Sequence, residues 1–396
     1  MPLIDLWNNS PEELEDKQIN QLIGIAGSGK LLDGSSCSTE LRELLANVHS
    51  QHLSKYAEQC LIQSFTDSGL ALQDVVNEIG ARLGADVTHG RYRGNSNNIG
   101  FDGLWKFDSG HAIVVEVKTT DTFRIDLNTI ARYRDALIDS KSIEETKSSI
   151  LLIVGRQDTG DLEAQIRGSR FAWDIRIISV YALLRLMSIK EEMEDPQIIQ
   201  RIHNILIPQE FTRLDYIAEI LFSATEDVKQ ETITHTADDM PDDIIIQSPK
   251  PAPASFHEAC IVEIQLTLSQ KLVKRTRALY STSDKSLMVN CAVSKEYDSD
   301  KKPNYWFAFH KHQRLLLQDA HIAYVAFGCG SSDRILLIPF NIFDTWLEKM
   351  WTTQRENGYY WHVVIFKNGE KYSLHRKKGE KNIDLTSYLI HKDNKK

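Results

Sequence analysis

The sequence lacks the features that mark secreted, membrane-spanning or zinc-binding proteins. Its 396 residues include only five cysteines, and these are scattered, with no Cys-x-x-Cys pair and no Cys/His zinc spacing. No stretch approaches the roughly 20 consecutive apolar residues that a membrane span needs. Residues 1–20 lack the pattern of a signal peptide. We therefore expect a cytoplasmic protein with reduced thiols and no membrane partner.

The chain also has no overall excess of positive charge. Its net charge is −9, which alone would disfavour a nucleic-acid-binding protein. The sign differs along the chain, however. Residues 255–396 hold 22 Lys and Arg against 15 Asp and Glu, a surplus of +7 that leaves −16 for the remainder. The same segment holds 19 of the 34 aromatic residues, so we expect a basic, aromatic-rich domain there.

A segment with few core-forming residues separates the acidic and basic parts. Residues 225–254 contain seven Asp and Glu, the run Pro249-Lys250-Pro251-Ala252-Pro253 and no aromatic residue. Such a composition is typical of an extended or disordered linker. The sequence thus predicts a helical N-terminal segment at residues 1–65, an α/β domain at 66–224, an acidic Pro-rich linker at 225–254 and a second, α+β domain at 255–396.

The most informative feature is a pair of opposite charges at the end of an apolar run. Residues 113–115 lead into Glu116-Val117-Lys118, and their β-branched side chains favour a buried strand. Side chains alternate between the faces of a strand, so Glu116 and Lys118 share one face. An acid and a base on a buried strand are costly unless they are paired or bind a metal. A purely structural role explains them poorly.

A second acid, Asp102, is predicted to fold back onto Glu116. Residues 101–107 and 111–118 have strand character, and Asp108-Ser109-Gly110 between them is a turn sequence. Two carboxylates with backbone carbonyls would form a hard oxygen site suited to Mg²⁺ or Mn²⁺. Lys118 beside them would orient or deprotonate a water. These are the groups that hydrolysis of a phosphodiester requires.

Asp102, Glu116 and Lys118 resemble the D-x(n)-E-x-K core of the PD-(D/E)XK, or restriction-endonuclease-like, nucleases. Phe101 stands where the nominal motif has proline. The resemblance covers residues 72–187, where the patterns predict, in order, a helix at 72–83, a first strand from residue 86, the hairpin, a helix at 126–139, a strand at 150–154, a helix at 161–171, a strand at 175–179 and a helix at 181–187.

This resemblance implies an α/β restriction-endonuclease-like core, a mixed sheet flanked by helices. In it, Asp102 and Glu116 would hold Mg²⁺ (or Mn²⁺), and Lys118 would activate or position the attacking water. In the Mrr-like branch of the superfamily, a Gln or Glu on the first helix approaches the metal, which implies an accessory role for Gln73 or Glu78. Glu78 could equally be a solvated charge. Gln165, on the helix at 161–171, is a further accessory candidate.

The segment at 255–396 has the pattern of a mixed α+β domain. Strands are predicted at 287–293, 305–309, 323–327, 334–338 and 360–366, with a helix at 342–350. Its aromatic residues either build the core or stack on bases. Basic residues gather in the predicted connections and suit contact with phosphates; the candidates are Lys274, Arg275, Arg277, Lys301, Lys302, Lys311, Arg314, Arg376, Lys377 and Lys378.

The sequence therefore predicts a Mg²⁺-dependent DNA endonuclease with a catalytic domain and a C-terminal recognition domain. By analogy of fold, such a pairing serves bacterial restriction or anti-phage defence. One alternative is a DNA-binding or assembly subunit of a defence complex, with little activity of its own and dependent on an ATPase or another subunit. Another is an RNase or a ligand-triggered effector nuclease. Because cutting both strands usually takes two active sites, a homodimer is also expected.

Overall fold

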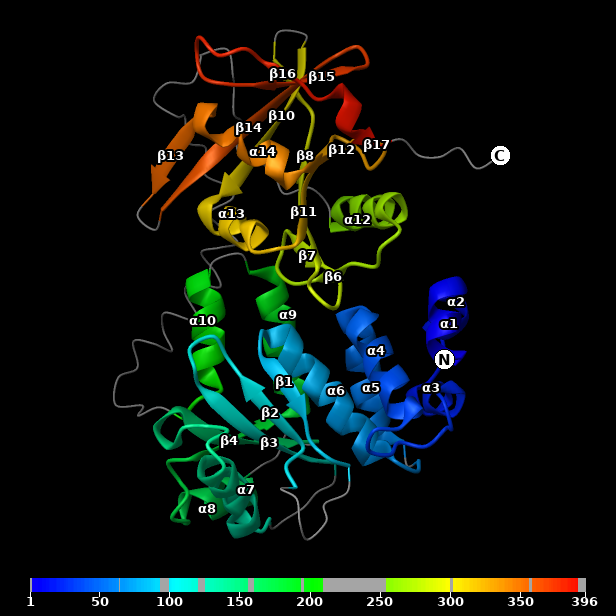
Figure 1. The fold of residues 1–396 in the computed structure, drawn as a ribbon, viewed down its shortest axis with the longest axis vertical. Helices are drawn as coiled ribbons and strands as arrows, with labels where there is room; N and C mark the ends of the chain where they lie inside the picture. The colour runs from blue at the N-terminus through cyan, green and yellow to red at the C-terminus, as the bar shows by residue number, and fades with distance from the viewer. Residues whose placement is uncertain are drawn as a thin grey trace. The chain divides into compact units, whose positions relative to one another are not determined.

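The computed structural model describes residues 2–63, 65–92, 100–119, 125–155, 160–193, 196–208, 254–299, 302–355 and 358–390. Contacts divide them into two compact units, drawn in Figure 1. The first holds the described residues up to Glu192 and most of α10 (Pro196–Ile205), and the second runs from α12 (Ala254–Leu268) onward. Both combine helices with mixed or antiparallel sheets, which confirms the expected mixed α/β class. The predicted acidic linker lies outside the described residues except for Ala254.

The first unit opens with helices, two of which pack against a longer helix, α6 (Ser68–Leu83). The predicted helical N-terminal segment contains α1 (Pro2–Asn9), α2 (Glu12–Glu15), α3 (Ile19–Ile25), α4 (Ser36–Asn47) and α5 (Ser50–Ile62). The hydroxyl of Ser35 caps α4 by accepting a hydrogen bond from Ser38 N–H at 3.2 Å. Both α4 and α5 contact α6. The predicted helix end at residue 83 is confirmed, and α6 is followed by Gly84, whose φ of +107° lies in the left-handed region.

A five-stranded mixed sheet follows, in the order β1-β2-β3-β4-β5. Its strands are β1 (Asp86–His89), β2 (Gly103–Lys106), β3 (Ala112–Lys118), β4 (Ser148–Val154) and β5 (Ile175–Ser179). The first three run antiparallel, and β4 and β5 lie parallel to β3. The predicted hairpin is confirmed, since Leu104 of β2 lies opposite Val114 of β3. The turn closes with Phe107 N–H donating to the His111 carbonyl at 3.0 Å.

Helices cover the two faces of this sheet (Figure 1). On one face, α7 (Leu127–Asp139) and α8 (Gly160–Arg167) bury apolar side chains against Val114, Ile150 and Leu152. On the opposite side lies α6, with α9 (Val180–Glu192) packed against it. Glu116 and Lys118 alternate in phase with Val114, so both point to the α7 side of β3.

The second unit contains two six-stranded sheets. One has the order β16-β15-β14-β10-β9 with β13 beside β14, and the other has the order β17-β12-β11-β8-β7-β6, in which β8 and β11 are parallel. Their core includes Phe307, Phe327, Val363 and Leu374. The strands are β6 (Val273–Lys274), β7 (Leu279–Ser281), β8 (Leu287–Ser294), β9 (Tyr297–Ser299), β10 (Lys302–His310), β11 (Ile322–Cys329), β12 (Ile335–Pro339), β13 (Thr352–Arg355), β14 (Gly358–Asn368), β15 (Lys371–His375), β16 (Ile383–Asp384) and β17 (Leu389–Ile390).

The five predicted strands of this unit are confirmed as β8, β10, β11, β12 and β14. The single helix predicted at 342–350 is wrong. The chain forms α14 (Phe340–Asp344) and, after a break, a short 3-10 turn at Leu347–Lys349. Another helix of this unit, α13 (Lys311–Gln318), follows β10. The apolar residues Phe343, Leu347 and Met350 are buried in the core, so packing of these side chains determines the local backbone more than helical periodicity does.

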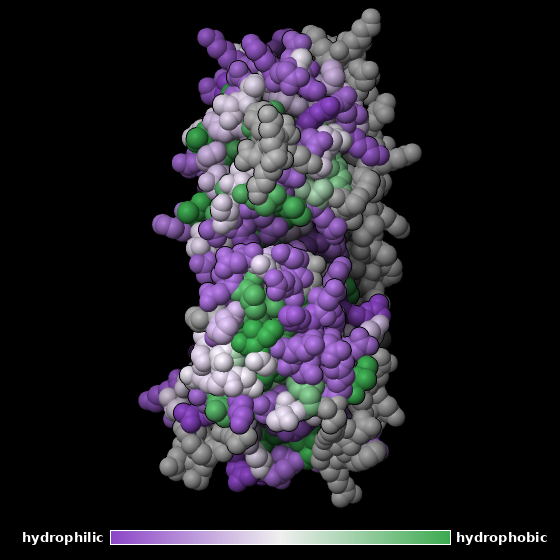
Figure 2. All heavy atoms as spheres, turned by 90° about the vertical axis from the view of Figure 1, so that its right-hand side faces the viewer, coloured by the Kyte–Doolittle hydropathy of each residue, from purple (hydrophilic) through white to green (hydrophobic). Residues whose placement is uncertain are grey.

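Polar residues predominate on the face drawn in Figure 2, where apolar residues form separate patches. Within the part of the chain that the structure describes, no helix is both long and apolar enough to cross a membrane.

Candidate functional site

The backbone of Asp102 is held at the start of β2 beside the end of β3. Its N–H donates to the Val115 carbonyl at 3.0 Å. Its carboxylate oxygen Oδ2 accepts a hydrogen bond from Val117 N–H at 2.7 Å. The hairpin therefore brings Asp102 to the strand segment that carries Glu116 and Lys118, as the sequence predicted.

Glu116 and Lys118 form an ion pair on β3. Lys118 Nζ donates to Glu116 Oε1 at 2.5 Å. Glu116 is only 7 % exposed, and its second carboxylate oxygen, Oε2, is buried with no hydrogen-bond partner among the described residues. A buried, charged oxygen without a donor is costly. The oxygen is thus a candidate ligand for a cation.

The two carboxyl groups are close enough to disturb each other's charge. Burial, followed by repulsion from Glu116, raises the pKa of Asp102 to about 7, although the Val117 hydrogen bond and the charge of Lys118 oppose the shift. Burial also raises the pKa of Glu116, against the attraction of Lys118. Burial lowers the pKa of Lys118, but the neighbouring carboxylates outweigh it and the net shift is upward. The single positive charge of Lys118 does not balance the negative charges of two ionised carboxylates, whereas a bound divalent cation would stabilise both.

Tyr133 on α7 belongs to this neighbourhood, and the sequence interpretation missed its hydroxyl. The residue lies in the helix predicted at 126–139, to which no site role was given. Burial raises the pKa of this phenol, and the charge of Glu116 adds to the shift. A Cβ built on Gly100 would lie 3.1 Å from the hydroxyl oxygen, so Tyr133 lies against the chain that leads into Asp102. A tyrosine on the first helix after the Glu-x-Lys strand was the available signal.

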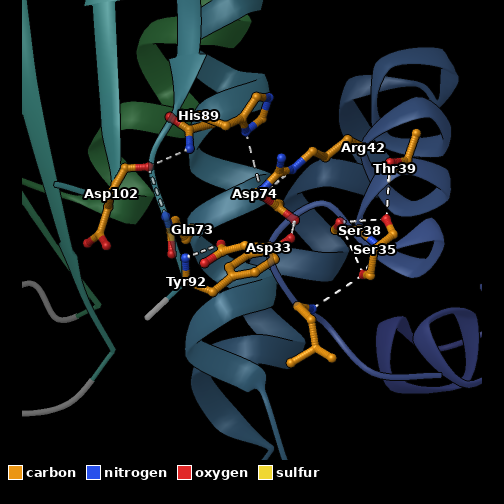
Figure 3. Close-up of polar contacts among 12 residues, drawn as sticks. Asp33, Ser35, Ser38, Thr39, Arg42, Gln73, Asp74, His89, Tyr92 and Asp102 are labelled. Carbon is orange, nitrogen blue, oxygen red and sulfur yellow. Dashed lines mark hydrogen bonds and ion pairs between the residues drawn. The ribbon is translucent and has the colours of Figure 1, made fainter. Parts of the chain in front are cut away.

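Two amide side chains of α6 approach Asp102 from the other side. Gln73 Nε2 and Asn77 Nδ2 each donate to the Asp102 carbonyl oxygen at 2.9 Å. In Figure 3, that carbonyl points toward Gln73 while the carboxylate of Asp102 points away from α6. Gln73 therefore reaches the site as predicted, but through the Asp102 backbone. Glu78 does not, because its carboxylate pairs with Arg82 at 2.9 Å.

A buried polar network extends from α6 to α4, and the sequence interpretation missed it (Figure 3). Asp74 is fully buried between Arg42 Nε at 2.9 Å and His89 Nδ1 at 3.6 Å, and the hydroxyl of Tyr92 donates to it. The Tyr92 N–H donates in turn to Asp33 at 2.8 Å. The network holds the chain that follows β1 against the N-terminal helices.

Gln165 is tied to a backbone segment and not to the acidic site. Its amide oxygen accepts from Ile125 N–H at 3.1 Å, and its Nε2 donates to the Ile125 carbonyl at 2.6 Å. The side chain thus closes the start of α7 onto α8. It lies in a shallow hollow with Arg170 and Phe171.

The basic candidates of the second unit divide into tied and exposed side chains. Arg275 donates to Ser281 Oγ at 2.9 Å, Arg314 donates to Asp344 at 2.6 and 3.0 Å, and Arg376 donates to the Lys381 carbonyl at 2.8 Å. These three side chains therefore make hydrogen bonds within the unit. Lys311, Lys377 and Lys378 are exposed. Lys274 lies in β6 and Arg277 follows it, both partly buried; Lys301 lies outside the described residues, as does the side chain of Lys302.

The aromatic residues of β10 and β14 are largely core residues. Tyr305, Tyr360 and Trp361 are buried, while Trp306 and Tyr359 are half-buried. Trp306 donates its Nε1–H to His362 at 2.9 Å. For most of them, the expectation that they build the core is therefore confirmed.

The structure describes no group of three or more His, Cys, Asp and Glu side chains placed to hold a metal. The acidic site consists of two carboxylates. No family model matches this chain, and no curated protein matches it significantly.

Proposed function

We propose that the first unit is a metal-dependent nuclease with a restriction-endonuclease-like core of the PD-(D/E)XK type. The carrying observation is the arrangement at the ends of β2 and β3. There, the buried carboxyl group of Glu116 and the partly buried one of Asp102 repel each other beside a charged lysine, and Glu116 Oε2 has no donor among the described residues. The reaction would be hydrolysis of phosphodiester bonds in DNA.

The residues present fit Mg²⁺ or Mn²⁺. The candidate ligands are the Asp102 carboxylate, Glu116 Oε2 and the carbonyl of Val117, all hard oxygens. Val117 N–H points at Asp102, and the N–H and C=O of one strand residue leave the same edge, so this carbonyl lies on the Asp102 side. Mg²⁺ sites commonly use one or two carboxylates and complete their shell with waters and substrate phosphate. When bound, the cation would supply a Lewis acid at the scissile phosphate.

The chain's own groups then have distinct roles. Asp102 and Glu116 hold the cation, and the hydrogen bond from Val117 fixes the Asp102 carboxylate. Lys118 remains an ammonium because Glu116 stabilises its charged form. In that state it positions a water or a phosphate oxygen by donating hydrogen bonds, and stabilises negative charge that develops in the transition state. Positioning of this kind contributes more to phosphoryl transfer than covalent chemistry does.

The second unit is proposed as the recognition domain. The support is the surplus of +7 charges in residues 255–396 and the exposure of Lys311, Lys377 and Lys378. Such surfaces attract the phosphate backbone. A role in bacterial restriction or anti-phage defence, with a homodimer or a partner subunit, follows from analogy of fold and belongs to the same proposal.

Replacement of Lys118 by Ala tests the assignment. The variant should lose Mg²⁺-dependent plasmid cleavage by at least about a hundredfold, a typical loss for one electrostatic group at the reacting centre, while DNA binding in a filter or mobility assay stays within about twofold. Arg167→Ala is the matched control, because this exposed residue of α8 makes only a loose contact of 3.8 Å with Glu163. Cleavage that survives in Lys118→Ala would overturn the assignment. Incubation with DNA and RNA of one sequence separates a DNase from an RNase.

A further inference from the structure

Hydrogen bonds fix the backbone N–H and carbonyl of Asp102 as well as its carboxylate. Strand β3 binds its N–H and one carboxylate oxygen. Its carbonyl accepts from Gly90 N–H at 3.0 Å as well as from the amides of Gln73 and Asn77. A backbone carbonyl normally needs fewer partners, and the N–H of Gly90, directly after β1, would satisfy this one alone. Two buried side-chain amides on this one atom therefore need an explanation.

The orientation of the Asn77 amide is set by Trp105. The Trp105 Nε1–H donates to Asn77 Oδ1 at 3.0 Å. An indole N–H can only donate, so the oxygen of Asn77 must face Trp105 and its NH₂ must face Asp102. Asn77 is 1 % exposed and Trp105 is fully buried, so water does not compete for either bond.

Gly103 makes room for this arrangement. A Cβ at Gly103 would lie 2.1 Å from Asn77 Oδ1, a distance that no side chain could occupy. The buried amide of Asn77 thus links α6 to the backbone of Asp102. Trp105 fixes the orientation of this amide, and Gly103 leaves the space for it.

We propose that Asn77, supported by Gln73, is a positioning residue that holds Asp102 in the geometry required for binding the cation. This inference rests on the proposed nuclease function. The two amides touch neither the carboxylate of Asp102 nor Lys118. They act through the backbone, by fixing where the carboxylate stands relative to Glu116. Displacement of a catalytic group by about 1 Å can lower a rate by about a hundredfold.

The test uses near-isosteric variants of the full chain, Asn77→Leu and Gln73→Met, which keep side-chain bulk and remove the donors. The control is Ile79→Val, a change on the same helix at a buried position that carries no hydrogen-bonding group. For each protein, Mn²⁺ affinity is measured by calorimetry and plasmid cleavage is measured across Mg²⁺ concentrations and pH. Thermal unfolding in EDTA ranks their stabilities.

We expect Asn77→Leu to weaken Mn²⁺ binding and to lower kcat by about tenfold or more, with DNA affinity unchanged and with the pH profile of cleavage displaced. Ile79→Val should leave Mn²⁺ affinity and the pH profile as in wild type. Wild-type affinity and kcat in a folded Asn77→Leu protein would overturn the positioning role. If Asn77→Leu does not fold, the same outcome in Gln73→Met decides. Absence of Mn²⁺ binding and cleavage in the wild type would instead refute the proposed nuclease function.

Discussion

At the residue scale, the site is defined by carboxyl groups placed where their charge is unfavourable. The pKa of Asp102 is raised to about 7 by burial and by Glu116. Between about pH 4 and about pH 7, the folded protein therefore keeps a proton that the unfolded chain has released. By linkage, the free energy of unfolding of the metal-free protein falls as the pH rises through this range. Shifts of this kind cluster at functional sites.

Asp102→Asn should stabilise the metal-free protein while removing its activity. At pH 8 in EDTA we expect the free energy of unfolding to rise by about 1–3 kcal/mol, because the amide removes a partly desolvated charge that Glu116 repels. At pH 4.5 the gain should largely vanish, since Asp102 is then protonated in the folded wild type. Urea unfolding at both pH values measures this. Asp126→Asn gives the contrast: hydrogen bonds from Thr129 lower the pKa of Asp126 at the start of α7, so this variant should be less stable at pH 8. A destabilised Asp102→Asn protein at pH 8 would contradict the account.

Divalent cations should stabilise the wild type more than Asp102→Asn, the opposite of the order of stability expected in EDTA. Binding only to the folded state stabilises it in proportion to the logarithm of ligand concentration over Kd, so Mg²⁺ or Mn²⁺ should raise the Tm of the wild type. Asp102→Asn should show little or no rise. The check is thermal unfolding across a Mn²⁺ titration, and equal increases in Tm for both proteins would argue against a cation at Asp102.

At the scale of elements, the order of α6, the β2–β3 hairpin, α7, β4, α8, β5 and α9 follows from sequence pattern. Apolar runs, turn residues and the glycine after α6 mark these elements directly. The polar contacts of α6 do not follow in the same way. Gln73 is marked only through the family resemblance, and no pattern marks Asp74 or Asn77, yet packing against α6 buries all three. The i,i+4 spacing of Glu78 and Arg82 permits the ion pair that forms, but sequence pattern alone does not establish that pair or the approach of Tyr133 to the acidic site.

The contact of β2 with α6 makes Gly103→Ala a sensitive change. The added methyl would collide with Asn77 Oδ1 at 2.1 Å, so we expect a loss of about 1–3 kcal/mol in the free energy of unfolding and reduced cleavage. Gly24→Ala is the control, because a Cβ at this helical position meets nothing within 4 Å. That variant should be stabilised by about 0.5–1 kcal/mol. Denaturant unfolding of the two proteins measures both effects; a neutral Gly103→Ala would contradict the close approach.

At the scale of the whole molecule, the chain joins an acidic first part to a basic second unit. The charge surplus of residues 255–396 is visible in the sequence, but its division between structural and exposed residues is not. Arg314 illustrates this division, since its guanidinium binds Asp344 in bidentate fashion and lies over the Trp361 ring at 5.7 Å. Lysines in the same unit remain exposed, and they are the better candidates for phosphate contact.

The double variant Lys377→Ala/Lys378→Ala should therefore weaken DNA binding without affecting the fold. We expect the dependence of log K on log salt to become shallower by up to about 2, about one for each lost phosphate contact, with Tm unchanged. Arg314→Ala should do the reverse, lowering Tm and leaving the salt slope unaltered. Binding titrations at several salt concentrations and thermal unfolding measure both. Loss of binding only in Arg314→Ala would place the DNA surface elsewhere.

The measurement that tests the central claim most directly is cleavage of supercoiled plasmid by the purified full chain. The wild type, Asp102→Asn and Glu116→Gln are compared in Mg²⁺, in Mn²⁺ and in EDTA, with modified and unmodified DNA side by side. We predict nicked or linear product only for the wild type and only with a divalent cation. Product in EDTA, equal cleavage by the carboxylate variants, or no cleavage with either cation on either DNA would contradict an autonomous metal-dependent nuclease.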